Sequence, residues 1–188
     1  MKTTKRARCP WVPEGNKLYC RYHDEEWGVP VHDDRKMFEF LVLESAQAGL
    51  SWLTVLKKRE AYREAFHNFD PARVAKFGAR DVNRLLKNAG LIRNRAKINA
   101  AVSNARAFLE IQKESGSFSR YLWAFVSGHA INHCLRRLAD YRPTCPEADL
   151  AAAELKKRGF KFLGPTTMYA HFQATGLVND HVISCFRY

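Results

Sequence analysis

Two cysteines and two histidines near the ends of the chain have the residue types of a metal site. Cys9 and His23 lie near the N-terminus, and His181 and Cys185 lie near the C-terminus. The last two are four positions apart, so on a helix they would face the same way. Two cysteines with two histidines form the closed ligand set of structural zinc. Such a site would tie the chain ends together and leave no open position for catalysis. The alternative is buried thiols and hydrogen-bonded histidines.

Glu44 is a carboxylate on an otherwise apolar helical stripe. It follows Met37 and Leu41 at the spacing of one helix face. A buried carboxylate without a partner costs on the order of several kcal/mol. It therefore indicates a binding role, a salt bridge to an arginine, or an edge position that reaches water. Gln47 and Trp52 follow closely. A carboxylate, an amide and an indole beside a loop could recognise a flat, polar, cationic ring.

Four aromatic residues crowd between positions 11 and 27: Trp11, Tyr19, Tyr22 and Trp27. Aromatic faces stack on nucleic-acid bases, and basic residues nearby favour that use. The alternative is that they form part of the apolar core, which is the commoner fate of an aromatic side chain. Their number alone leaves both interpretations open.

Residues 81–98 read DVNRLLKNAGLIRNRAKI, in which two helical patterns flank a turn centred on Gly90. The backbone N–H groups of such a turn and the N-terminus of the following helix attract a phosphate. Contacts of this kind position a duplex without reading its sequence. The alternative is an ordinary helical corner with solvated charges. After Asp81 the segment has no acidic residue, and its basic residues are Arg84, Lys87, Arg93, Arg95 and Lys97.

The elements that carry these residues all show helical periodicity, and no stretch alternates at period two. The fold class is therefore predicted to be all-α. Gly90 is expected to end the first arm of the hairpin as its C′ residue. A last short helix is expected to begin at Asn179 or Asp180. Apolar stripes at helical spacing also cover residues 82–89, 98–109 and 121–126. The remaining predicted helices cover residues 33–48, a stretch from Ser51 through Tyr62, a short helix at Asp70-Pro71, residues 147–158, and a stretch from Thr166 or Thr167 to near Gly176.

Composition limits the class of protein. The 188 residues suit one domain or two interleaved lobes, and 46% of them are apolar. Thirty-one basic against nineteen acidic residues give a net charge of +12, which favours a polyanionic partner over simple solubility charge. No apolar run reaches the length of a membrane span, and residues 1–8 lack the apolar region of a secretory signal. We therefore expect a cytoplasmic protein without a membrane partner, and the odd number of cysteines argues against a disulfide framework.

Several strings in order resemble the DNA-3-methyladenine glycosylase I family of the helix–hairpin–helix glycosylase superfamily. The most specific are QAGLSW, LKKRGFKF and GLVNDH. They lie within longer matching segments: CPWVPEGNKLYCRYHDEEWGVP (9–30), FEFLVLESAQAGLSWLTVLKKREAYREAF (38–66), NAGLIRNRAKI (88–98) and LKKRGFKFLGPTTMYAHFQATGLVNDH (155–181), followed by Cys185.

The resemblance implies an all-α, helix–hairpin–helix fold in which one structural zinc ion joins the two termini. The implied domain covers residues 9–188 after a basic tail, 1–8. The implied ligands of zinc are Cys9, His23, His181 and Cys185. Glu44 takes the position of the catalytic acid that contacts the methylated base, and Trp52 that of the ring that stacks on it. The other expected base-binding residues are Tyr22, Tyr19, Trp11 and Gln47.

For DNA binding, the resemblance implies that Leu50, after Gly49, fills the gap left by an extracted base. The hairpin at Gly90, with Arg93, Arg95 and Lys97, would grip phosphates. The implied partner is double-stranded DNA with alkylated bases, bound by a monomer. Ala151-Ala152 and the arginines Arg136, Arg137 and Arg142 depart from the family pattern.

The implied activity is hydrolysis of the N-glycosidic bond of 3-methyladenine, which leaves an abasic site. N3-methylation makes the base cationic and a good leaving group, so extrusion and recognition are the main tasks. Residues 98–109 hold no carboxylate, although many superfamily relatives carry a catalytic aspartate after the hairpin. The group that activates water is therefore unassigned. The alternatives are a non-catalytic protein that binds alkylation damage and a zinc-tethered protein–protein module.

Overall fold

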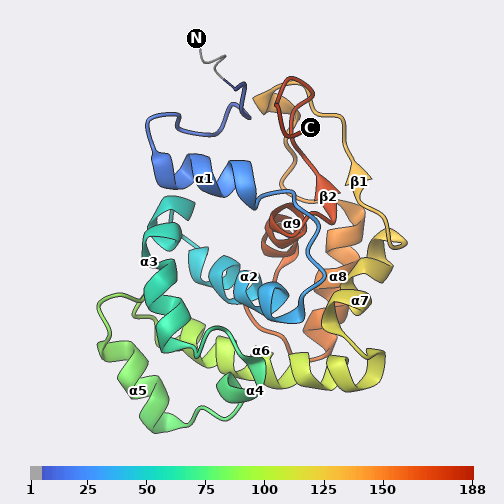
Figure 1. The fold of residues 1–188 in the computed structure, drawn as a ribbon. Helices are drawn as coiled ribbons and strands as arrows, with labels where there is room; N and C mark the ends of the chain where they lie inside the picture. The colour runs from blue at the N-terminus through green and yellow to red at the C-terminus, as the bar shows by residue number, and fades with distance from the viewer. Residues whose placement is uncertain (1–5) are drawn as a thin grey trace.

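The long helix α2 (Asp34–Gln47) forms the centre of the fold. A computed structural model describes residues 6–188, and Figure 1 shows α2 with α6 below it and α9 above it. Every residue from Met37 to Ala46 in this helix is buried. The side chain of Asp33 caps its start by accepting from the Lys36 N–H. At its end Gly49 turns the chain with φ of 80°, a conformation that favours glycine.

The remaining helices and two short strands surround α2 (Figure 1). The predicted all-α class is confirmed. The helices are α1 (Lys17–Glu25), α3 (Trp52–Ala65), α4 (Pro71–Val74), α5 (Ala79–Lys87), α6 (Arg95–Ser115), α7 (Phe118–Trp123), α8 (Pro146–Lys157) and α9 (Pro165–Ala174). Two 3-10 turns, η1 (Ala124–Val126) and η2 (Leu138–Asp140), and two strands, β1 (Ile131–Asn132) and β2 (Val178–Asn179), complete the described elements.

The prediction of a last helix starting at Asn179 or Asp180 was wrong. Val178 and Asn179 instead form β2, which pairs in parallel with β1. The carbonyl of Asn179 accepts a hydrogen bond from the His133 N–H at 3.3 Å, so its backbone is committed to the strand pair. Residues 180–188 continue as turns. A two-residue pairing with a segment nearly fifty positions away leaves no periodic signal.

The prediction that Gly90 ends a helix as its C′ residue was also wrong. Helix α5 ends at Lys87 with Asn88 as its C-cap, and Gly90 does not adopt a left-handed conformation. A Cβ at Gly90 would lie 2.6 Å from the Cβ of Ala61. Glycine is therefore required because α3 packs directly against the turn between α5 and α6.

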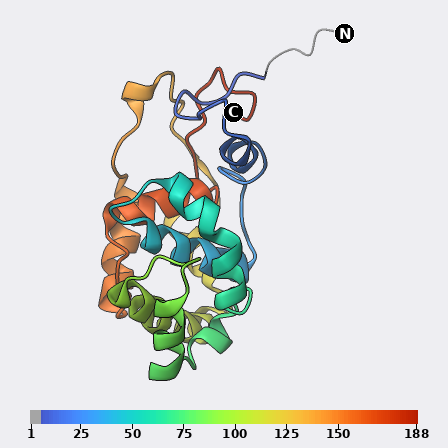
Figure 2. The ribbon, with the colours of Figure 1, turned by 90° about the vertical axis from the view of Figure 1, so that its left-hand side faces the viewer.

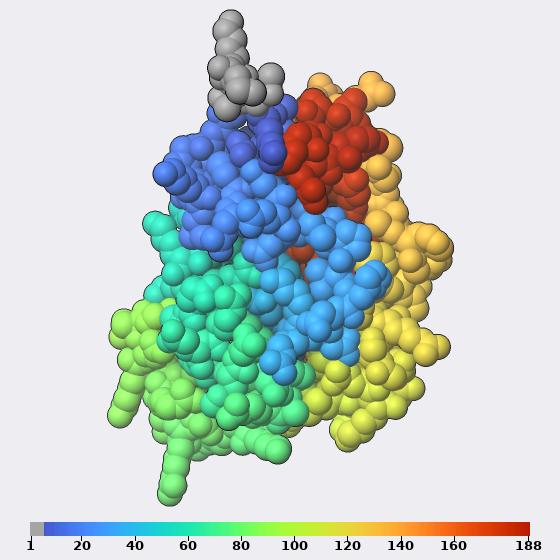
Figure 3. Space-filling model, viewed as in Figure 1, coloured from blue at the N-terminus to red at the C-terminus, as the bar shows by residue number. Residues whose placement is uncertain are grey.

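The two ends of the described chain lie together (Figures 1 and 2). Figure 3 shows the N-terminal segment in direct contact with the C-terminal segment at the surface. The carbonyl of Ala7 accepts from the Phe186 N–H at 2.8 Å, and the Arg6 guanidinium lies 5.1 Å from the centre of the Phe186 ring. Residues 1–5 of the predicted tail lie outside the described residues. Among residues 6–188, no helix is long and apolar enough to cross a membrane.

A buried ion network fixes α1, α2 and α3 relative to one another. The Arg59 guanidinium of α3 donates to both carboxylate oxygens of Glu26 and to Glu39, each at 2.7 Å. Glu26 caps the end of α1, and Glu39 lies in α2. Burial raises the pKa of Glu26, but hydrogen bonds from Arg59 and Lys36 outweigh it and lower that pKa to about 2.

We expect Arg59→Met to destabilise the protein by about 3 kcal/mol at pH 7, because Glu26 and Glu39 lose three charge-assisted hydrogen bonds and keep only Lys36 and, for Glu39, Arg63 as charged partners. The stability that Glu26 contributes is present above its ordinary pKa of 4.5 and is lost as the pH falls through about 2. The difference from wild type should therefore shrink in acid. Urea unfolding at pH 7 and pH 4 measures it. Lys113→Met, which removes an exposed pair with Glu110, should cost less than about 1 kcal/mol. Equal losses in the free energy of unfolding for the two variants would show that the buried ion network does not stabilise the fold.

Candidate functional site

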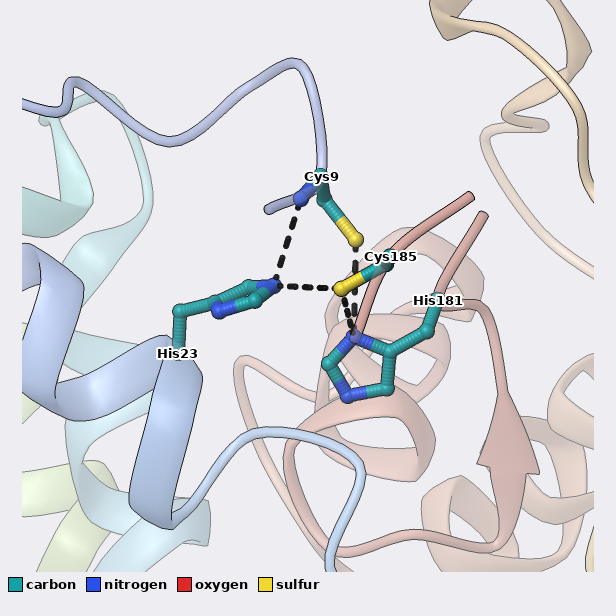
Figure 4. A group of neighbouring side chains, drawn as sticks. All are labelled: Cys9, His23, His181 and Cys185. Carbon is teal, nitrogen blue, oxygen red and sulfur yellow. Dashed lines mark hydrogen bonds between the residues drawn. The ribbon is translucent and has the colours of Figure 1, made fainter. Parts of the chain in front are cut away.

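The four predicted metal ligands meet where the chain ends come together (Figure 4). All four are buried, and their ligand atoms lie within 4.8 Å of one another. The Cys9 Sγ is 3.4 Å from His181 Nδ1, and the Cys185 Sγ is 3.5 Å from both His181 Nδ1 and His23 Nε2. A tetrahedral zinc ion with its usual bond lengths separates its ligand atoms by about 3.3–3.8 Å. The cluster thus has the composition and size of a site that could hold a metal ion.

In both His23 and His181, the ring nitrogen that faces away from the cluster has a hydrogen-bond acceptor. His23 Nδ1 lies 2.8 Å from the Asp24 carboxylate, which Arg8 holds through two hydrogen bonds. His181 Nε2 lies 3.0 Å from the carbonyl oxygen of Trp27. Because those nitrogens donate, the lone pairs of His23 Nε2 and His181 Nδ1 point into the cluster. This tautomer is the one a metal ion requires.

His181 and Cys185 face the same point without the helix that their spacing suggested. A tight turn brings them together, in which the Cys185 N–H donates to the Val182 carbonyl at 2.8 Å. The side chain of Asn179, in β2, accepts from the His181 N–H at 3.1 Å. The expected partners are therefore present, but a strand and a turn position them.

A cavity of about 320 Å³ lies beside this cluster. Its lining includes all six residues that the sequence suggested for a base pocket: Trp11, Tyr19, Tyr22, Glu44, Gln47 and Trp52. Five further residues also line it: Trp27, Leu138, Tyr141, Ala170 and Gln173. Trp27 had been noticed among the crowded aromatics. Leu138 and Tyr141 lie outside the matching segments of the sequence, whereas Ala170 and Gln173 lie within the segment 155–181 but had no role assigned to them.

Glu44 lies in this cavity without a protein partner. It is 5% exposed, and no hydrogen bond or ion pair from residues 6–188 reaches its carboxylate. Burial raises its pKa to about 8. The interpretation of Glu44 as half of a salt bridge therefore fails, because Arg59 is committed to Glu26 and Glu39.

Aromatic rings form the walls around Glu44. The rings of Tyr22 and Trp52 are 5.3 Å apart, and those of Trp11 and Trp27 are 4.7 Å apart. The Trp52 Nε1–H is buried and has no acceptor among residues 6–188. The Trp27 ring also lies 4.7 Å from that of His181. The metal-type cluster and the cavity therefore share a wall.

A buried aspartate orients one of the unpredicted cavity residues. Asp180 accepts from Gln173 Nε2 and from His133 Nδ1, each at 2.6 Å, and from the Tyr169 hydroxyl. An ionised carboxylate only accepts hydrogen bonds, so the amide nitrogen of Gln173 must turn toward Asp180. Its amide oxygen makes no hydrogen bond within residues 6–188 and is left for the cavity.

The residues expected to bind DNA are distributed over the surface between α2 and α6. Leu50 is 41% exposed in the loop between α2 and α3. Arg93 is exposed in the segment between α5 and α6, and Arg95 is exposed as the first residue of α6. Lys97 instead donates to the carbonyls of Ala46 and Ala48, at 2.9 and 2.5 Å. Its ammonium group therefore stabilises the end of α2 that carries Glu44.

Residues 11–188 match the family described as methyladenine glycosylase. The chain belongs to this family. A relative from Haemophilus influenzae named DNA-3-methyladenine glycosylase is 51% identical over 180 residues, which cover 95% of this chain and 96% of the relative. The family resemblance seen in the sequence is confirmed.

Solved structures of methyladenine glycosylases have the same fold. A crystal structure of 3-methyladenine DNA glycosylase I is 52% identical with a TM-score of 0.93, covering 96% of this chain and 98% of that one. A tyrosine-to-phenylalanine variant of 3-methyladenine DNA glycosylase I, in complex with 3-methyladenine, is 40% identical with a TM-score of 0.90 and covers 93% and 95% of the two chains.

The raised pKa of Glu44 should make stability depend on pH. The free energy of unfolding that the Glu44 carboxyl group contributes is full below its ordinary pKa of 4.5. It is lost as the pH rises through the raised pKa of about 8. We expect Glu44→Gln to be more stable than wild type by about 3 kcal/mol at pH 7 and by less than about 1 kcal/mol near pH 5. Urea unfolding between pH 5 and pH 8 measures this. Glu60→Gln, at an exposed position, is the control, and parallel profiles for wild type and Glu44→Gln would refute the assignment.

Proposed function

We propose that the chain is a monofunctional DNA glycosylase that hydrolyses the N-glycosidic bond of 3-methyladenine in alkylated double-stranded DNA. The product is an abasic site for base excision repair. We further propose that it acts as a monomer in the cytoplasm. The observation that carries the proposal is the unpartnered Glu44 carboxyl group inside an aromatic cavity. A 3-methyladenine complex of a relative supports the choice of base.

The cavity suits a cationic base better than a neutral one. N3-methylation gives adenine a positive charge, and the faces of Trp52, Tyr22 and Trp11 attract a cation. That charge would also lower the pKa of Glu44, which burial alone raises to about 8. Entry of the base should therefore leave Glu44 ionised, so that it accepts a charge-assisted hydrogen bond from the exocyclic amino group. Neutral adenine offers no compensation for the buried charge.

The reaction needs little from an acid. The oxygen of a water molecule bonds to C1′ of the deoxyribose as the C1′–N9 bond breaks. The electron pair of that bond moves to the base and neutralises it, and the water proton is released. The enzyme's contribution is to extrude the nucleotide and to hold its base. The Gln173 amide oxygen, fixed by Asp180, offers a second acceptor in the cavity.

We propose that the duplex is held by a helix–hairpin–helix made of α5, α6 and their connecting turn. The start of α6, which follows the turn at Gly90, would contact phosphate, with Arg93 and Arg95 nearby. Leu50, turned outward by Gly49, would fill the gap left by the extruded base. Lys97 supports this arrangement indirectly by holding the end of α2.

We also propose that the buried Cys9, His23, His181 and Cys185 hold one structural zinc ion. The residues fit the ion because three sulfur–nitrogen distances, of 3.4–3.5 Å, match a tetrahedral site and both histidines present the required lone pair. When bound, zinc would supply folding free energy and no chemistry of hydrolysis. Because the Trp27 carbonyl accepts from His181, the site would also steady one wall of the base cavity.

The activity test is release of free bases from dimethylsulfate-treated duplex DNA, resolved by chromatography. Wild type should release 3-methyladenine and not 7-methylguanine. Glu44→Gln should slow release on the order of 100-fold, because it removes the charged acceptor. Glu60→Gln is the matched control and should retain the wild-type rate. Binding of alkylated DNA without any release would instead support the damage-binding alternative.

The metal test is elemental analysis together with thermal unfolding. Wild type should contain about one zinc ion per chain. Cys185→Ala should lose it and become less stable by several kcal/mol, because the binding free energy is part of folding. Cys134→Ala alters an exposed cysteine outside the cluster and should retain zinc. A wild-type protein that contains no zinc and is still fully stable would overturn the proposal.

A further inference from the structure

A second hollow, of about 510 Å³, adjoins the base cavity. Tyr141 lines both, so the segment from Leu138 to Tyr141 forms the wall between them. Leu138 lines the base cavity although it is 57% exposed. Ala139 and Asp140 line the hollow. Figure 2 shows the segment around η2 projecting at the end of the molecule where the termini meet.

The hollow carries positive charge that the protein does not neutralise. Arg136 and Arg142 line it, and neither has an ion pair within residues 6–188. Asp140 is the acidic residue in its lining, and its carboxylate is occupied. One oxygen accepts from the backbone N–H groups of Arg136 and Arg137, at 2.9 and 3.1 Å, and the other accepts from the Arg137 side chain at 3.2 Å. The two free guanidinium groups are therefore available to an anion.

The hollow is also fixed relative to the base cavity. The Tyr141 hydroxyl accepts from Trp11 Nε1 and donates to the Asp180 carbonyl, both at 3.0 Å. The carbonyl of the buried Leu135 accepts from the Ile183 N–H at 2.8 Å. Within the hollow, His133 is held by the Asp180 carboxylate. A site fixed in this way binds its ligand with little loss of conformational entropy.

We infer that this hollow binds a phosphate of the DNA strand whose extruded base occupies the neighbouring cavity. The base and phosphate of a nucleotide project from different sides of its sugar, as the two hollows lie on different sides of one wall. Guanidinium groups bind phosphate through paired, charge-assisted hydrogen bonds. The exposed Leu138 would then face the sugar between them. This inference rests on the proposed glycosylase function, and it gives a role to arginines that lie outside the family's sequence strings.

The test compares wild type with the double variant Arg136→Ala/Arg142→Ala. The probe is a fluorescent duplex containing a tetrahydrofuran abasic-site analogue, titrated between 50 and 200 mM salt. Each phosphate contact contributes about 0.9 to the slope of log affinity against log salt. If both arginines contact phosphate, wild type should lose about 12-fold more affinity than the variant over this range. Affinity for free 3-methyladenine, followed by tryptophan fluorescence, should stay unchanged.

The matched control is Arg35→Ala/Arg120→Ala, which removes the same net charge. Arg35 is the second residue of α2. Arg120 lies in α7, whose first backbone N–H groups donate to Asp34. Both are exposed, and Arg35 lies nine residues before the cavity residue Glu44, which is about 14 Å along the axis of α2. The control should keep the wild-type slope. An unchanged slope in the first variant, or equal loss in both, would overturn the inference. A wild type that neither binds nor releases 3-methyladenine would instead refute the proposed function.

Discussion

Burial of one unpaired carboxylate is the constraint on which the site depends. Glu44 belongs to a helix whose central ten residues are all buried, so its position follows from the packing of α2 and not from any attraction of its own. The same burial raises its pKa to about 8. A group held in this state gains from a positively charged ligand more than an exposed carboxylate would, because little water is present to screen it.

The distribution of arginines keeps Glu44 free. A protein with a charge of +12 has many cations that could neutralise a buried acid. Arg59, the one buried arginine among residues 6–188, donates to both Glu26 and Glu39. Lys97 reaches the end of α2 but bonds to its carbonyl groups. The network therefore serves two purposes: it joins three helices, and it keeps their cations away from the cavity.

The joined chain ends supply the other side of the cavity. Trp11 follows Cys9 closely and contacts Trp27 and Tyr141, while Trp27 contacts His181 through both its ring and its carbonyl group. A change in the Cys/His cluster would therefore displace the aromatic wall of the cavity more directly than it would displace α2. Fold stability and base recognition are coupled at this one place.

The sequence alone determined the helical class, the four Cys/His residues, the stripe that buries Glu44 and the aromatic residues around it. Each of these rests on residue type or on spacing within a few turns, which local patterns report. Only the tertiary structure decided which distant segments complete the site. Leu138, Tyr141 and Gln173 line the cavity, Lys97 bonds to α2, and a turn instead of a helix brings Cys185 to His181. Periodicity reveals that a face is buried but not what covers it, because that depends on packing between segments far apart in the chain.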